Sequence, residues 1–270
     1  MVRLKFYFSY EGTHYNGWQR QKNTANTIQQ IFEDKLSRLA GDKRVNLVAS
    51  GRTDAGVHAR VQVGHADANE TLLKLLSQPA GAPNQTYVEQ NRLQQSLNSM
   101  LPPDIRVLKI EQVGTGFHAQ RDVEKKTYLY FINPNPVQWP ELRDHAWHLK
   151  FPLNWAAMEQ ATKALIGEHD FKAFCAADAD TSTTIRTLFE AEWGDFTWRG
   201  MSAPTELRVL RLTGNGFLKN MVRSIVGTLT MIGNGKAESD LVPELLARPN
   251  RQAAGPTAPP HGLWLWDILY

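Results

Sequence analysis

A hydrophobic pattern occurs twice in the same order along this 270-residue chain, and it limits the folds that the chain can form. Alternating apolar residues mark strands, and apolar residues three or four positions apart mark helices. Each half contains, in order, a strand, a helix, two strands, a helix and a strand. In the first half the strands span 2–10, 45–50, 57–66 and 105–113, and the helices 28–39 and 93–97. In the second half the strands span 126–133, 185–193, 206–213 and 263–269, and the helices 154–166 and 218–232. This order is that of the split βαβ unit, an antiparallel sheet with helices on one face. The sequence therefore predicts an α+β fold of two tandem ferredoxin-like lobes, residues 1–115 and 116–270, whose sheets join into one extended sheet.

Two proline- and glycine-containing segments interrupt this pattern. Residues 77–86 have the composition of a linker, and we expect them to form an exposed insertion. Residues 248–262 lead directly into the last strand. They are interpreted as a connecting loop, with the lining of a cleft as the alternative.

Positive charge is unevenly distributed, although the net charge is only +3. Residues 1–66 contain ten Lys and Arg against five acids, and residues 207–236 contain five Lys and Arg and no acid. A polyanion would bind these two regions in preference to the rest of the chain. The alternative is that the basic residues solvate outer faces.

The cysteine count and the apolar segments bear on location. Cys175 is the only cysteine, so an intramolecular disulfide cannot form. The N-terminus reads as a strand and lacks the apolar core of a signal peptide, and no apolar stretch is long enough to cross a bilayer. We expect a soluble cytoplasmic protein that has no contact with a membrane.

Residues 51–58, Gly-Arg-Thr-Asp-Ala-Gly-Val-His, bring a guanidinium and a carboxylate together between two glycines. The segment lies between two predicted strands, so it forms the end of a hairpin. Gly51 and Gly56 can adopt positive φ, which would let the loop turn sharply and hold Asp54 at a sheet edge within reach of a ligand. The alternative is a surface turn in which the aspartate caps its own backbone.

Two further segments carry candidate binding residues. Arg223 lies beside the apolar stripe of the predicted helix 218–232, where a half-buried guanidinium needs a carboxylate or phosphate partner unless it merely covers apolar surface. Tyr128 and Tyr130 share one face of the strand 126–133. Strand tyrosines mostly pack, but a tyrosine beside basic residues can also stack on a base.

These segments together resemble the tRNA pseudouridine synthase A family along nearly the whole chain. The resemblance depends on residues 15–21, 51–58, 97–102, 117–119, 167–171, 216–223 and 262–263. It implies that Asp54 is the catalytic aspartate, that Arg52 extrudes the target base, that Tyr128 stacks on that base, and that Arg223 is the ion-pair partner of the aspartate. The other candidate RNA contacts are Arg20, His58, Phe117, His118, Lys219 and Asn220. Gln120 stands where the family usually has arginine, which puts one RNA contact in question.

The resemblance implies a reaction and a substrate. A member of this family isomerises uridine to pseudouridine in the anticodon stem-loop of tRNA, at positions 38, 39 and 40, in a catalytic cleft between the lobes. The N-glycosidic bond breaks, the uracil turns, and it rejoins the ribose through C5 while the enzyme supplies a nucleophile. An aspartate is ionised at neutral pH and suits this task. Attack at C1′ and addition at C6 are both open, and the base must be flipped out of its stem-loop.

The resemblance also implies a homodimer, for which Trp139, Trp147 and Trp198 are candidate interface residues. We expect no metal or cofactor, because the eight histidines lack paired ligand spacing and no phosphate-cradling glycine motif occurs.

Two other functions were weighed. A non-catalytic RNA-binding module with tandem RRM-like lobes would explain the basic regions and Tyr128, but not an acid inside the most basic part of the chain. Glycoside cleavage requires a second positioned carboxylate, and none lies near Asp54 in the sequence.

Overall fold

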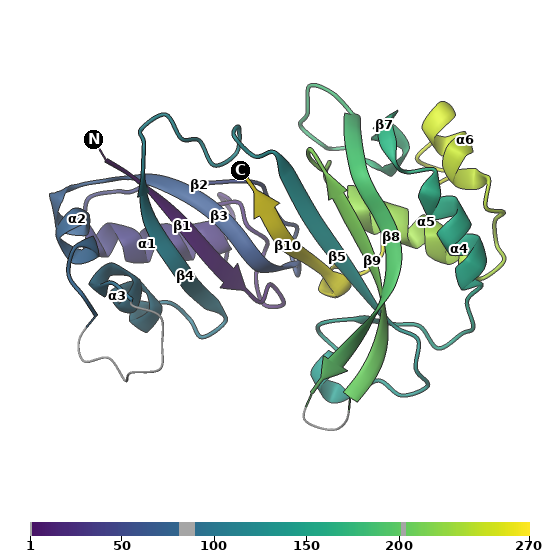
Figure 1. Ribbon diagram of the computed structural model, residues 1–270, viewed down its shortest axis with the longest axis horizontal. Helices are drawn as coiled ribbons and strands as arrows, with labels where there is room; N and C mark the ends of the chain where they lie inside the picture. Colours follow the sequence, from purple (N-terminus) through teal and green to yellow (C-terminus); the bar gives the residue numbers. More distant parts are fainter. Residues whose placement is uncertain (1, 81–89, 201–203) are drawn as a thin grey trace. The chain divides into compact units, whose positions relative to one another are not determined.

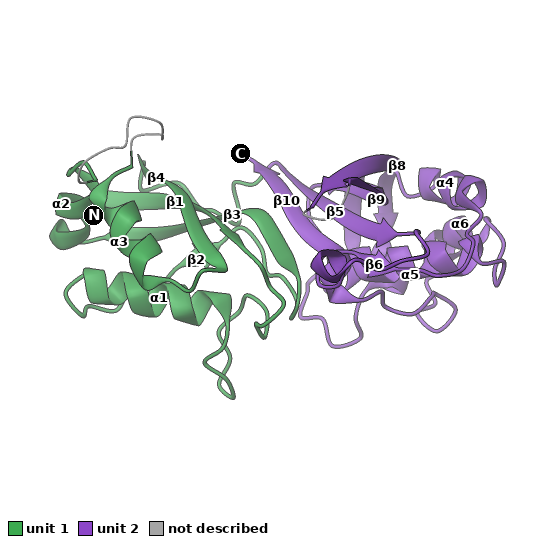
Figure 2. Ribbon diagram, turned by 90° about the horizontal axis from the view of Figure 1, so that it is seen from below, with its two compact units in different colours: residues 1–123, 270 green, residues 124–269 purple. Residues whose placement is uncertain are grey.

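The computed structural model of the protein describes residues 2–80, 90–200 and 204–270 (Figure 1). The chain divides into two compact units, which are described separately below. Unit 1 contains residues 1–123 and residue 270, and unit 2 contains residues 124–269 (Figure 2). Most of the expected insertion 77–86 lies outside the described residues.

Unit 1 is an antiparallel sheet with helices packed on one face. Its elements are β1 (Val2–Tyr10), α1 (Ile28–Leu39), β2 (Val48–Ala49), β3 (His58–Ala68), α2 (Glu70–Leu76), α3 (Arg92–Met100) and β4 (Ile105–Val113). The strand order is β4-β1-β3, with β2 paired to β3. The first strand therefore lies between the last and the third.

The alternation in β1 produces the core of unit 1. Phe6 and Phe8 are fully buried, and both contact the ring of Phe32 on α1, with centroid distances of 5.6 and 5.2 Å. Trp18 stacks on Phe8 at 5.3 Å. Thr27 caps α1 by accepting a hydrogen bond from the backbone N–H of Gln30, which satisfies one donor of the first turn.

Unit 2 repeats this arrangement with additional short elements. Its strands and helices are β5 (Lys125–Asn133), β6 (Trp147–His148), α4 (Trp155–Lys163), β7 (Gly167–Asp170), β8 (Ile185–Arg199), β9 (Pro204–Gly214), α5 (Met221–Gly233), α6 (Leu241–Ala247) and β10 (Leu263–Leu269), with short 3-10 helices at Pro140–Leu142, Phe171–Phe174 and Pro260–Gly262. The strand order is β10-β5-β9-β8-β7, and β6 pairs with β5. As in unit 1, the first long strand lies between the last strand and the third.

The two faces of the unit 2 sheet differ in composition. One face carries Tyr128 and Tyr130, next to α5 and the segment that follows it (Figure 1). The other face carries a cluster around Leu129 and Phe131, over which five partly buried aromatic residues pack, namely Trp139, Phe196, Trp198, Trp264 and Trp266.

The elements differ from the sequence expectation at a few points. Helices α2 and α6 and strands β6 and β7 were not expected, and β2 is shorter than 45–50. Helix α5 begins at Met221 rather than 218, because Asn220 is left-handed with φ of 62° and ends the preceding loop. In the part of the chain that the structure describes, no helix has both the length and the apolarity to cross a membrane.

Candidate active site

The loop that carries Asp54 connects β2 and β3 in unit 1. Gly56 has a positive φ of 77°, as expected, whereas Gly51 lies outside the positive-φ region. The Val57 N–H donates to the Asp54 carbonyl at 3.2 Å and closes the turn. At the start of the loop, the buried Gln62 side chain donates to the Gly51 carbonyl at 3.0 Å. The loop is therefore fixed at both ends.

Residues 10–18 brace the same loop through hydrogen bonds. The Trp18 N–H donates to the Thr53 carbonyl at 3.0 Å, and the Gly56 N–H donates to the Tyr15 carbonyl at 3.3 Å. The hydroxyl groups of Tyr10 and Thr53 are hydrogen-bonded at 2.8 Å. These bonds involve residues on either side of Asp54 in the sequence, so they fix the backbone that presents its carboxylate.

His58 lies in the interior of unit 1 and supports the Asp54 loop. It is fully buried, and its Nδ1 accepts a hydrogen bond from the Gly12 N–H at 3.1 Å. This hydrogen bond joins His58 to the segment that follows β1, and a role of His58 as an RNA contact stays a prediction. Asp54 itself is half-buried and Arg52 is exposed, whereas Thr53 between them is buried. Of the two charged residues of the loop, Arg52 is therefore the more exposed.

Gly17 makes the close approach of the two segments possible. Its φ is 85°, and a Cβ at this position would lie 2.8 Å from the Thr53 carbonyl oxygen. We expect Gly17→Ala to lower the free energy of unfolding by more than about 2 kcal/mol, because left-handed alanine and a backbone clash both cost energy. We expect turnover to fall as well, because the clash displaces the loop that carries Asp54. Urea unfolding and steady-state kinetics measure the two effects.

Gly41→Ala is the matched control for that substitution. Gly41 has a similar φ of 76°, but no atom lies within 4 Å of the Cβ that would be added. This variant should lose only about 1 kcal/mol of stability, with turnover unchanged. Equal losses of stability and turnover in the two variants would show that the close contact between Gly17 and the Asp54 loop contributes to neither.

Tyr128 lies on β5 in unit 2, on the same face as Tyr130. Its side chain is 7% exposed, and its ring meets Phe217 edge to face at 4.9 Å. Phe217 belongs to the loop 215–220 that precedes α5. Phe217 is not among the residues singled out from the sequence, yet its ring packs against Tyr128.

Arg223 lies in the first turn of α5, and its contacts include hydrogen bonds to Ala258 and Asn220. Its Nε donates to the Ala258 carbonyl at 2.7 Å, and its Nη1 donates to the Asn220 side-chain oxygen at 3.1 Å. The Ala258 N–H in turn donates to the Arg223 carbonyl at 3.0 Å. The half-buried guanidinium is thus fixed by a backbone group that is distant in the sequence.

The segment 255–259 can approach α5 because both sides carry a glycine. A Cβ at Gly227 would lie 1.6 Å from the Pro256 carbonyl oxygen, and the Gly255 N–H donates to the Thr228 hydroxyl at 2.8 Å. The segment interpreted as a connecting loop therefore positions Arg223. A glycine inside an apolar helix, followed by a glycine in the loop, is the sequence signal that could have indicated this contact.

The remaining candidate RNA contacts are distributed over both units. In unit 1, Phe117 and His118 lie half-buried in a turn after β4, and the Ala119 N–H in that turn donates to the Nδ1 of His65 at 3.0 Å. Burial lowers the pKa of His65 to about 4, so this histidine is neutral and able to accept that bond at physiological pH. In unit 2, exposed Lys219 forms an ion pair with Asp178 at 2.6 Å.

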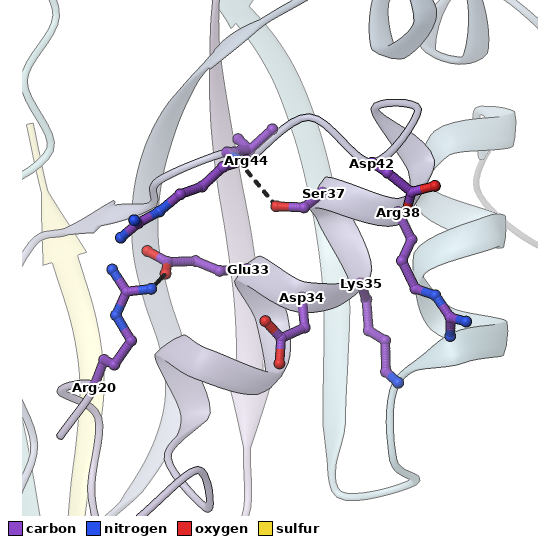
Figure 3. A pocket seen from close by; sticks show the side chains of 9 residues that line it. Arg20, Glu33, Asp34, Lys35, Ser37, Arg38, Asp42 and Arg44 are labelled. Atoms are coloured by element: carbon purple, nitrogen blue, oxygen red, sulfur yellow. Dashed lines mark hydrogen bonds and ion pairs between the residues drawn. The ribbon is translucent and has the colours of Figure 1, made fainter. Parts of the chain in front are cut away.

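Arg20 lies at a hollow on unit 1 with a volume of ≈ 630 Å³ (Figure 3). Its Nη1 is 3.2 Å from the Glu33 carboxylate, which is almost fully buried and also accepts a hydrogen bond from the Leu47 N–H at 2.8 Å. Figure 3 shows the side chains of Arg20 and Arg44 directed toward Glu33. Arg20 is therefore partly neutralised by its own unit.

The described residues contain no cluster of three or more His, Cys, Asp or Glu side chains arranged to hold a metal ion. The candidate residues that they do contain are Arg52 and Asp54 on the loop of unit 1 and, in unit 2, Tyr128 beside Phe217 and Arg223 hydrogen-bonded to Ala258.

The mixed α+β fold is consistent with that of pseudouridine synthases. The family model described as tRNA pseudouridine synthase matches residues 7–120 and 161–270. The tRNA pseudouridine synthase A of Bacillus pumilus (strain SAFR-032) is 41% identical over 270 residues, which cover all of this chain and 99% of that protein. The same enzyme from Bacillus subtilis (strain 168) is 41% identical with the same coverage, and that of Thermoanaerobacter sp. (strain X514) is 39% identical over the full length of both chains. The chain belongs to the tRNA pseudouridine synthase family.

Proposed function

We propose that the protein isomerises uridine to pseudouridine in the anticodon stem-loop of tRNA, at positions 38, 39 and 40, with Asp54 as the nucleophile. The observation that carries the proposal is the family match, which covers the Asp54 loop in unit 1 and the segments of β9, α5 and β10 in unit 2. The braced loop supports the role of Asp54, because a nucleophile must be presented in a fixed position. The repeated strand order supports two tandem ferredoxin-like lobes.

Four residues have separate roles in the proposed reaction. Arg52 helps to extrude the target uridine, and Tyr128 stacks on the flipped base. The carboxylate of Asp54 attacks the nucleotide, at C1′ or at C6, and the bond between C1′ and N1 breaks. The uracil turns within the site, and C5 forms the new bond to C1′. The bond between the Asp54 carboxylate and the nucleotide breaks, the C5 proton leaves to solvent, and N1 takes up a proton. Arg223 stabilises the ionised carboxylate.

The resemblance also supports two proposals on the working state of the protein. We propose a homodimer, with Trp139, Trp147 and Trp198 as interface candidates; Trp139 and Trp198 pack, partly buried, against the cluster around Leu129 and Phe131. Light scattering after size-exclusion chromatography tests this proposal. We propose a cytoplasmic location because the substrate is tRNA.

Tritium release tests the reaction and its location together. With a tRNA transcript labelled at C5 of uracil, we expect the protein to release tritium into water, because the C5 proton is lost when the new bond forms. A transcript with cytidine at positions 38, 39 and 40 should release none. Tight binding of the labelled tRNA without release would support a non-catalytic RNA-binding module instead. Undiminished release from the cytidine transcript would overturn the proposed location.

A further inference from the structure

The basic residue Lys126 shares the face of β5 that carries Tyr128. Side chains alternate along a strand, so Lys126, Tyr128 and Tyr130 point to one face and Lys125 to the other. Lys126 is paired in register with Gly214 on β9. A Cβ at Gly214 would lie 3.6 Å from the ring of Phe217, the same ring that meets Tyr128 edge to face. Lys126 is therefore the neighbour of Tyr128 on this face of β5, two residues away in the sequence.

Arg186 reaches the same region from the beginning of β8. Its Nη1 donates to the carbonyls of Thr183 at 3.0 Å and Ile185 at 2.6 Å, so its guanidinium has a fixed position. A Cβ at Gly216 would lie 3.5 Å from the Arg186 Nε, which shows that the guanidinium lies against the loop containing Phe217. Three segments, from β5, β8 and the loop before α5, thus bring two cations to one place.

The charges of these two residues affect one another. Burial lowers the pKa of Lys126 to about 8, and the positive charge of Arg186 acts in the same direction. Burial also lowers the pKa of Arg186, and Cys175 is the group that opposes this effect. Lys219, on the loop before α5, forms its ion pair with Asp178. A bound anion would offset the repulsion between Lys126 and Arg186 and the cost of their burial.

We propose that Lys126 and Arg186 bind a phosphate of the RNA strand next to the nucleotide that stacks on Tyr128. The inference rests on the proposed function, because it assigns a binding site to the phosphate next to the flipped nucleotide. Both side chains are half-buried, so a phosphate can reach them without unfolding any element. Arginine and lysine are the usual phosphate ligands, and a contact beside a flipped base holds the backbone at the point where it must bend.

Salt dependence of tRNA binding tests the proposal. For each phosphate contact removed, the slope of log K against log[salt] should become shallower by about 0.7 to 0.9. We expect this change for Lys126→Met and for Arg186→Gln, measured by filter binding at pH 7. Lys125→Met is the matched control, because Lys125 is the adjacent lysine on the opposite face, where its ammonium lies 5.0 Å from the Phe189 ring. Its slope should equal that of the wild type.

A pH comparison keeps the test decisive if a variant folds poorly. In the free protein Lys126 loses its charge above its pKa of about 8, so at pH 9 it must take up a proton to bind a phosphate, and wild-type affinity for tRNA should fall between pH 7 and pH 9. Lys126→Arg should lose less affinity over the same range, since arginine stays protonated.

Unchanged slopes in Lys126→Met and Arg186→Gln, or a pH response in Lys126→Arg equal to that of the wild type, would overturn the inference. Tritium release by the same wild-type preparation is independent of these slopes. Failure of the phosphate site is thereby distinguished from failure of the proposed reaction.

Discussion

Replacing Asp54 by Asn should abolish tritium release from tRNA labelled at C5 of uracil. Asparagine has nearly the shape of aspartate but carries no charge, so it removes the nucleophile and leaves the braced backbone of residues 51–57 in place. We expect kcat to fall by ~10⁴-fold or more, the order of loss seen when a nucleophile is removed from an enzyme. Affinity for tRNA should change little, because binding depends mainly on basic residues and stacking. Single-turnover release and filter binding on one preparation measure both quantities.

Asp34→Asn is the control for loss of one negative charge in unit 1. Asp34 is exposed on α1, and its carboxylate accepts a hydrogen bond from the Gln30 side chain at 2.8 Å. This variant should retain wild-type release. If Asp54→Asn released tritium at the wild-type rate, another group would have to be the nucleophile, and the assignment of Asp54 would be wrong.

Replacing Arg223 by Ala should also remove most of the activity. The resemblance implies that this guanidinium stabilises the catalytic carboxylate, and the structure shows it fixed by the Ala258 carbonyl and the Asn220 side chain. Loss of a preorganised charged group typically lowers kcat by about 10²- to 10³-fold. The effect should fall on kcat rather than on KM, because Arg223 is assigned to the acid and not to the RNA. Steady-state tritium release over a range of tRNA concentrations separates the two constants.

Arg223→Lys distinguishes charge from geometry. Lysine keeps the positive charge, but its ammonium lacks the planar fork that donates to Ala258 and Asn220. We therefore expect it to remain well below wild-type activity while circular dichroism and thermal unfolding stay close to wild type. Full activity in Arg223→Ala would remove the arginine from the mechanism.

The long strands could be predicted from the sequence because each contains an alternation or a run of apolar residues about as long as the strand. In β1 the apolar residues alternate, whereas β5 is buried on both faces. The expected bounds of β1, β4, β5 and β10 agree with the structure within a residue. Helices α2 and α6 were missed because each spans only seven residues, too few to show a helical period. The start of α5 was misjudged because the left-handed conformation of Asn220 leaves no mark in hydrophobic periodicity.

The site could be predicted only where its residues are close in the sequence. The spacing of Arg52 and Asp54 between two glycines indicates a turn between two strands, and the structure has a turn there in which Arg52 is exposed and Asp54 is half-buried. The bracing of that loop by residues 10–18, and the support of Arg223 by Ala258, join positions more than thirty residues apart. Such contacts follow from tertiary packing, and a local pattern cannot show them.

The bonds between Arg223 and residue 258 have a consequence for how such enzymes diversify. Both use main-chain atoms of residue 258. The path of the main chain, and not the side chain at that position, therefore sets the orientation of the guanidinium. A comparison of residue types would therefore assign no role to position 258 beyond small size. The path depends instead on Gly227 and Gly255, where an added methyl group would meet the backbone of the other segment.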